Sequence, residues 1–98
     1  MTPVEIEAVV LQAMRTLNLA RRPEGLLQVS PTAPLFGAGS PLDSMGLLTL
    51  LIEVEEALQD AGEDVTLSDA RAVSRDRSPF RDVPSLVDFI SGLIAERR

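Results

Sequence analysis

Neither cysteine nor histidine occurs in this sequence. Without cysteine the chain can form no disulfide and carries no thiol of its own. Without histidine it lacks the side chain that most often shuttles protons and ligates metals at neutral pH, and with it any Ser-His-Asp or Cys-His arrangement. We therefore expect no catalytic residues, no metal site and no enzymatic activity from the chain itself.

Aromatic and basic side chains are also scarce. Three phenylalanines are the only aromatic residues, so the core has to be built from aliphatic side chains. The net charge of −6 opposes binding to the phosphates of nucleic acids and favours basic partners. No apolar run approaches the roughly 20 residues of a membrane span, and the chain does not open on a signal-peptide pattern. We expect a cytoplasmic, monomeric protein that binds neither nucleic acid nor membranes.

What the sequence does contain is helical periodicity near both ends of a single domain, residues 1–98. Thr2 and Glu5 have the spacing of a capping box, and Pro3 suits the first helical position. Apolar residues then recur at three- and four-residue spacing and form one helix face; they are Ile6, Val9, Val10, Ala13, Met14 and Leu17. A last helix opens near Pro84, with its apolar face formed by Leu86, Phe89, Ile90, Leu93 and Ile94.

Between residues 18 and 43 the periodicity gives way to a connection rich in proline and glycine. Loops of this length are often functional or carry packed structure of their own. The apolar residues expected to tie this one to the core are Leu26, Leu27, Val29, Leu35 and Phe36. A strongly apolar helix follows over residues 44–60, with Asp43 as its N-cap and Gly62 just past its end.

Residues 63–82 predict shorter elements. We expect an extended approach over residues 65–67, a short helix over residues 68–73 and one further turn over residues 78–81. With the three longer helices, these patterns predict an all-α fold, a small four-helix bundle with a long first loop and a short third helix. The arginines of residues 71–81 belong either to solvated surface or to a loop that selects a partner.

Ser44 stands where the long loop turns into helix, and several roles are open to a serine in that place. Serine is a favoured capping residue, and an exposed hydroxyl is also a site for covalent modification. Nucleophilic catalysis is a poor fit, because Leu42 occupies the first glycine position of a Gly-x-Ser-x-Gly elbow and the chain has no histidine to accept the proton.

Three short stretches together resemble the acyl carrier proteins of fatty-acid and polyketide synthesis. They are Leu-Phe-Gly at residues 35–37, Leu-Asp-Ser-Met at residues 42–45 and Ile-Glu-Val-Glu-Glu-Ala-Leu at residues 52–58. In that family, the serine of an Asp-Ser-Leu/Met step at the start of the second of four helices carries 4′-phosphopantetheine from coenzyme A. The resemblance implies a covalent cofactor site at Ser44 beside Asp43, and a carrier that holds an acyl intermediate as a thioester.

The resemblance also implies partners. They are a phosphopantetheinyl transferase, an acyl-loading enzyme (an acyltransferase or an acyl-activating ligase) and a condensing or acyl-accepting enzyme. The residues expected to contact them are Met45, Leu48, Glu53 and Glu56. Relatives in the family often carry acids where this chain has Gly46 and Thr49, which predicts selective exchange with partners. The residues expected either to line the carried chain or to form ordinary core are Leu48, Leu51, Ile52, Phe89 and Ile90.

Two alternatives stay open at the level of the sequence. A peptidyl or aminoacyl carrier of non-ribosomal peptide synthesis also has an acidic or histidine residue before its modified serine, although a glycine is expected there at position 42. The second alternative belongs to another class, an acidic helical adaptor that binds a basic partner without a cofactor. In that case Ser44 would be only a helix cap.

Overall fold

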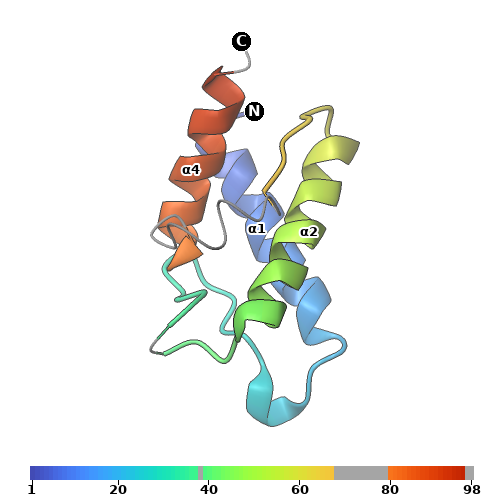
Figure 1. The fold of residues 1–98 in the computed structure, drawn as a ribbon, viewed down its shortest axis with the longest axis vertical. Coiled ribbons are helices and arrows are strands. Elements are labelled where there is room, and N and C mark those ends of the chain that lie inside the picture. Colours follow the sequence, from blue (N-terminus) through green and yellow to red (C-terminus); the bar gives the residue numbers. More distant parts are fainter. Residues whose placement is uncertain (38, 68–79, 97–98) are drawn as a thin grey trace.

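The computed structural model describes residues 1–37, 39–67 and 80–96 (Figure 1). Within them lie three α-helices, α1 (Pro3–Asn18), α2 (Ser44–Asp60) and α4 (Val83–Glu96), and the 3-10 turn η1 (Pro23–Gly25). This part of the chain forms no β-strand, which confirms the predicted all-α class. The short helix expected over residues 68–73 and most of the turn expected over residues 78–81 lie outside the described residues, so the fourth helix stays a prediction.

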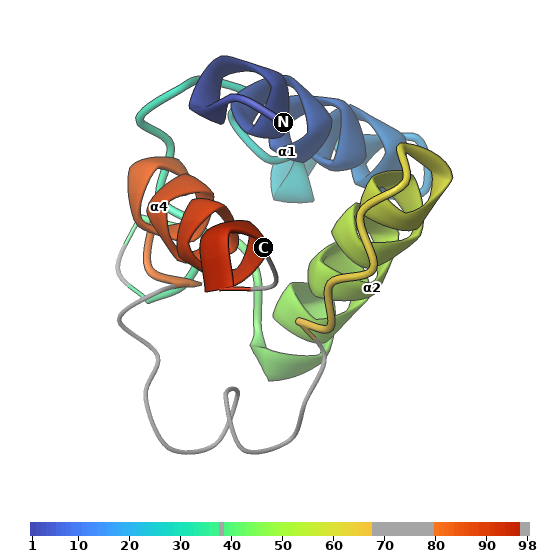
Figure 2. The ribbon, with the colours of Figure 1, turned by 90° about the horizontal axis from the view of Figure 1, so that it is seen from above.

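Figure 2 shows the three helices arranged around a common centre, and their buried apolar side chains belong to one core cluster. Helix α1 packs against both α2 and α4. The start of α1 and the end of α4 lie at one end of the molecule, and η1 lies at the other (Figure 1). Among the helices of the described residues, none combines the length and the apolar character that crossing a bilayer requires.

The core is aliphatic, as the composition predicted, and within the described residues it contains no buried polar side chain. Each helix contributes the apolar residues that its periodicity placed on one face. The fully buried large side chains among them are Ile6, Val10, Met14, Leu47, Leu50, Leu51, Leu58, Leu86 and Ile90. Phe80 is also fully buried and packs edge-to-face on Phe89, with ring centroids 5.6 Å apart.

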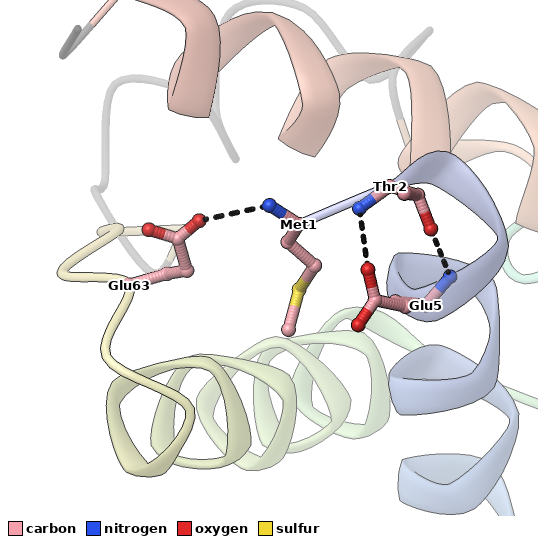
Figure 3. A network of polar contacts seen from close by, with 4 residues as sticks. All are labelled: Met1, Thr2, Glu5 and Glu63. Carbon is pink, nitrogen blue, oxygen red and sulfur yellow. Dashed lines mark hydrogen bonds and ion pairs between the residues drawn. The ribbon is translucent and has the colours of Figure 1, made fainter.

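The capping box predicted for α1 is present (Figure 3). The backbone N–H of Glu5 donates to the Thr2 hydroxyl at 3.2 Å, and the backbone N–H of Thr2 donates to the Glu5 carboxylate at 2.9 Å. This second hydrogen bond is the main reason that the pKa of Glu5 is lowered, since it stabilises the charged form. Both donors would otherwise lack an intrahelical partner.

Gly62 lies just past the end of α2, as the sequence indicated. Gly62 has a φ of +91°, its N–H donates to the Gln59 carbonyl, and the N–H of Glu63 donates to the Leu58 carbonyl at 2.9 Å. These two hydrogen bonds form the Schellman arrangement, for which glycine is the favoured residue because it lacks a Cβ. The turn brings Glu63 Oε2 within 3.7 Å of the Met1 α-amino nitrogen (Figure 3), so the exit of α2 contacts the start of α1.

The connection after α1 is packed and hydrogen-bonded. The side-chain amide of Asn18 both donates to and accepts from the backbone of Leu27, at 3.0 and 2.8 Å. Leu27 is buried, Val29 is half-buried and Leu26 is 46% exposed. The prediction that Leu26 ties the loop to the core was wrong, because an extended backbone points consecutive side chains to opposite sides and Leu27 takes the inner one.

Farther along, the same connection pairs with the start of α4. The N–H of Leu35 donates to the Arg81 carbonyl at 2.8 Å, and the N–H of Val83 donates to the Ala33 carbonyl at 3.0 Å. Leu35 is fully buried beneath this pairing and Phe36 is half-buried against the core, as expected. The loop is therefore fixed to α4 before it reaches residue 44.

Candidate functional site

The chain approaches position 44 through a compact turn. Gly37 and Gly39 both have positive φ values, +92° and +87°, which side chains with a Cβ rarely adopt. The Ser40 hydroxyl donates to the Leu35 carbonyl at 2.9 Å and accepts from the N–H of Leu42 at 3.2 Å. Ser40 thereby joins the buried part of the loop to the residues that immediately precede α2.

Two more contacts fix this approach. The Arg21 guanidinium donates to the Gly25 carbonyl at 2.6 Å and to the Pro41 carbonyl at 3.5 Å, so it bridges η1 and the segment before α2. Leu42 is buried in the core. The backbone is thus held on both sides of Pro41, which limits the positions open to the first residue of α2.

Asp43 is the N-cap of α2, as predicted. Its backbone is extended, and its carboxylate accepts a hydrogen bond from the N–H of Gly46 at 2.7 Å. Ser44 is the first residue of the helix. Helix geometry leaves the N–H groups of Ser44 and Met45 without intrahelical acceptors, at the end of the helix where the dipole is positive.

Gly46 has a structural role that the sequence did not reveal. A Cβ at this position would lie 2.9 Å from Leu42 Cδ2 and 3.2 Å from the capping oxygen Asp43 Oδ1. Because Leu42 is buried, its side chain has little room to withdraw. Gly46 therefore lets Leu42 fold over the start of α2 while Asp43 caps it. A glycine in the first turn of an otherwise strong helix was the available signal for such a close approach.

The residues predicted to contact partners divide between two sides of α2. Met45 is 69% exposed and Glu56 is also exposed, and helical spacing places them on one outer stripe. The same stripe contains Ile52, which was expected to line the carried chain or to form core and is 40% exposed. Leu48 is half-buried beside this stripe, on the side that helical spacing also assigns to position 44. These four residues form the outer face of α2.

Glu53 belongs to another surface. It is half-buried and lines two adjoining hollows between α1 and α2, of about 260 and 370 Å³. The smaller hollow is lined by Ala8, Val9, Gln12, Ala13, Thr16, Glu53 and Ala57. The larger one is lined by Thr16, Leu17, Ala20, Arg21, Gly46, Thr49 and Glu53.

The residues proposed to line a carried chain are not equivalent. Leu51 and Ile90 are fully buried members of the core, and Phe89 is engaged with Phe80. Only Leu48 and Ile52 combine proximity to the start of α2 with partial exposure. Both hollows described above lie on the α1 side of α2, away from these two residues.

A further contact holds the segment after α2 against the helix. The Glu55 carboxylate accepts a hydrogen bond from the backbone N–H of Leu67. Val65 and Leu67 are buried and Thr66 is exposed, which is the alternation expected for an extended approach. Helical spacing puts Glu55 on the side of α2 that carries position 44, so residues 65–67 run along that side.

The site therefore consists of a fixed loop, a capped helix start at Ser44 and an outer helix face that joins apolar to acidic side chains. Such a helix start favours a bound or attached anion, because its unpaired N–H groups and its dipole both attract negative charge. Comparisons of the chain with known protein families, with curated proteins and with solved structures found no match.

Proposed function

We propose that this chain is an acyl carrier protein and that Ser44 carries a 4′-phosphopantetheine arm. The observation that supports this most is the position of the Leu-Asp-Ser-Met motif. Its serine is the first residue of α2, its aspartate caps the same helix, and its leucine is buried beneath the junction. On this proposal the described helices are the first, second and last of the family's four, and the third is the short helix that the sequence predicts over residues 68–73.

The surroundings of Ser44 fit a phosphodiester. The N–H groups of Ser44 and Met45 need acceptors, and the helix dipole stabilises an exposed anion by about 0.3–1 kcal/mol. The Asp43 carboxylate opposes a second negative charge nearby, but it is engaged with the N–H of Gly46 at 2.7 Å. A prosthetic thiol also suits a chain that has no cysteine.

The chemistry of attachment requires little from the chain itself. The Ser44 hydroxyl forms a phosphodiester with the pantetheine phosphate, the phosphoanhydride bond of coenzyme A breaks, and adenosine bisphosphate leaves with the transferase assisting proton removal. The chain's part is to hold residue 44 at a fixed helix start, through Asp43 and the buried Leu42. The arm would then supply the thiol on which acyl groups are carried.

Partner enzymes would contact the outer face of α2. Met45 and Ile52 offer exposed apolar surface near the start of the helix, and Glu56 offers negative charge farther along it. Apolar contact suits a short-lived but specific interface, and charge complementarity chiefly raises the rate of association and selects the partner. Apart from Asp43, the start of α2 carries no charged side chain over residues 44–52, which favours dedicated partners over those adapted to strongly acidic carriers.

The proposal is tested by incubating the purified chain with coenzyme A and a phosphopantetheinyl transferase of broad specificity. We expect the intact mass to rise by one phosphopantetheinyl group. Ser44→Ala should show no rise, while Thr49→Ala, which removes another hydroxyl from the same helix, should be modified like the parent. A chain that is never modified, with a basic partner that binds equally well to Ser44→Ala, would instead identify an adaptor without a cofactor.

A further inference from the structure

The two hollows between α1 and α2 form one trough. They share Thr16 and Glu53, and together they extend along α2 from Gly46 to Ala57. Eleven helical steps of 1.5 Å make this length about 16 Å, or three turns of helix. Short residues on both helices contribute to the trough, because they leave part of the space between the helix axes unfilled; they are Ala8, Ala13, Gly46 and Ala57.

The side of the α1–α2 pair opposite α4 is thus incompletely packed. Its floor is apolar where Val9, Ala13 and Ala57 meet, and Ala8 stands exposed at the edge. A helix laid along two others buries its own apolar stripe in such a groove, with contacts at i, i+3, i+4 and i+7. Three turns are long enough for the four or five anchoring residues of that arrangement.

The charges around the trough are unevenly distributed. At the end near Ala57, α2 carries two exposed acids, Glu56 just before that residue and Asp60 about one turn after it, and Glu5 stands one helical turn before Ala8 on α1. At the opposite end Arg21 lines the trough. The Arg15 guanidinium donates at 3.4 Å to Oε1 of Gln12, a residue that lines the smaller hollow.

We propose that the trough between α1 and α2 is a docking groove for an amphipathic helix of a partner protein, with the helix's basic residues at the end formed by Glu5, Glu56 and Asp60. The half-buried Glu53 carboxylate gives a second contact for a basic side chain in the middle. A second copy of this chain fits poorly, because its net charge of −6 repels another like it.

This groove is separate from the proposed attachment site. Helical spacing places Gly46, Glu53 and Ala57 on one side of α2 and position 44 on the other. A partner helix in the groove therefore reaches the outer face only at Glu56, and it leaves position 44 and the apolar part of that face, Met45, Leu48 and Ile52, uncovered. The inference does not depend on phosphopantetheine, and a chain that carries no prosthetic group would still present the groove.

The test uses a labelled synthetic peptide of about 18 residues, long enough to form helix on binding. It carries leucines at helical spacing on one face and lysines in one half. We expect it to bind the full chain and to shift the amide signals of Ala8, Ala13 and Ala57. A peptide with glutamate in place of every lysine should bind at least about fivefold more weakly, since each exposed charge pair is worth up to about 1 kcal/mol.

Matched variants locate the binding. Ala8→Gln fills the groove edge and should weaken binding about tenfold, the loss typical of a blocked interface contact. Ala95→Gln, which makes the same change at an exposed position of α4, should leave it unchanged. Glu56→Gln should weaken binding, whereas Asp88→Asn on α4 and Ser44→Ala should not. The proposal would be overturned if the basic and acidic peptides bound equally well, or if the basic peptide bound Ala8→Gln as tightly as the parent chain. Self-association of the chain through α1 would overturn it as well.

Discussion

Asp43 determines how α2 begins. Its carboxylate accepts from the N–H of Gly46 at 2.7 Å, and its carbonyl accepts from the N–H of Leu47 at 2.9 Å. The side-chain contact satisfies one of the donors that every helix start leaves unpaired. At the same time Asp43 is the acidic residue next to the proposed attachment site, so one side chain has two separable roles.

Substitution of Asp43 separates its role as helix cap from its role as the acidic residue beside the proposed attachment site. Asp43→Ala should lower the free energy of unfolding by about 1 kcal/mol, through loss of the cap, and should slow modification of Ser44. Asp43→Asn should restore most of the stability, because asparagine caps about as well as aspartate. Chemical denaturation measures the stability, and intact mass against time measures the modification.

The rate of modification of Asp43→Asn distinguishes capping from recognition. If Asp43→Asn is modified as fast as the parent, Asp43 serves only to fix the helix start. If Asp43→Asn is modified as slowly as Asp43→Ala, the transferase recognises the negative charge itself. An unchanged free energy of unfolding in Asp43→Ala would contradict the cap.

Asp82 has the corresponding place at the start of α4. Its carboxylate accepts from the backbone N–H of Ser85 at 2.9 Å, and Arg81 Nε lies 3.8 Å from its other oxygen. The pKa of Asp82 is lowered chiefly by a hydrogen bond from the Ser85 side chain, with help from the Ser85 backbone and the Arg81 charge. The charged form is thus favoured in the folded state.

A lowered pKa fixes the direction of the pH dependence. The stability that Asp82 contributes is fully present above its unfolded pKa of about 3.9, and it is lost as the pH falls through the lower folded value. We therefore expect Asp82→Asn to flatten the acid side of the stability profile, measured by urea unfolding from about pH 6 downwards. Ser85→Ala should flatten it in part, and an unchanged acid slope in both variants would contradict the assignment.

At the scale of the elements, α2 combines a strong helical sequence with a glycine in its first turn. Gly46 is the only helical glycine of the described residues at which an added Cβ would meet an atom closer than 3 Å. By contrast, a Cβ added at Gly92 in α4 would meet nothing within 4 Å. The two helices thus offer the same substitution in opposite surroundings.

Replacement of Gly46 and of Gly92 by alanine should have opposite effects on stability. Gly92→Ala should raise the free energy of unfolding by about 0.5–1 kcal/mol, the usual gain of helix propensity. Gly46→Ala should lose this gain and lower stability, because the added methyl displaces Leu42 and the Asp43 carboxylate. Thermal or urea unfolding of both variants tests this, and an equal gain in the two would show that the start of α2 has more room than its geometry indicates.

The elements also show which features a sequence can reveal. Periodicity and capping residues predicted α1, α2 and α4 with their caps Thr2 and Asp43, because these signals lie within a few residues of each other. The exposure of Leu26 and the Arg21 bridge depend on how segments far apart in the sequence meet, so no local pattern predicted them. The Leu42–Gly46 contact is local, and its one signal in the sequence was a glycine in the first turn of the helix.

At the scale of the whole molecule, negative charge is distributed unevenly over α2. The acids begin at Glu53, and the turns nearest Ser44 carry Met45, Gly46 and Thr49 instead. The sequence suggested that acids at both Gly46 and Thr49 would suit partners of acidic carriers. Gly46 is unsuitable for that purpose, because any side chain there meets Leu42, and the exposed Thr49 is the better position.

Thr49→Glu should speed the reaction with a transferase adapted to acidic carriers, by about threefold at low ionic strength, because complementary charge raises association rates. The effect should shrink as salt is added, since exposed charges are screened over about 10 Å at 0.1 M salt. Thr32→Glu adds the same charge at an exposed turn of the long loop and should have little effect. Equal rates for the two variants would show that charge at position 49, in the second turn of α2, does not select the partner.

The sequence predicted the candidate site as a motif, and the geometry adds what supports it. Asp43 and Ser44 could be placed at a helix start because the loop residues before them and the apolar pattern after them are both local signals. The sequence did not predict that Glu53 lies on a different surface of α2 from Met45 and Glu56, since this depends on how α1 packs against α2. The trough between these helices is likewise a product of packing.

The intact mass of the protein purified from its native cells tests the assignment of Ser44 most directly. We expect a species heavier than the 10.6 kDa chain by a phosphopantetheinyl group, with or without an attached acyl group, and fragmentation that places the addition on Ser44. The mass of any acyl group would also identify what the carrier holds. A chain without the addition, from cells that contain an active phosphopantetheinyl transferase, or an addition placed on another residue, would contradict the carrier function proposed for this protein.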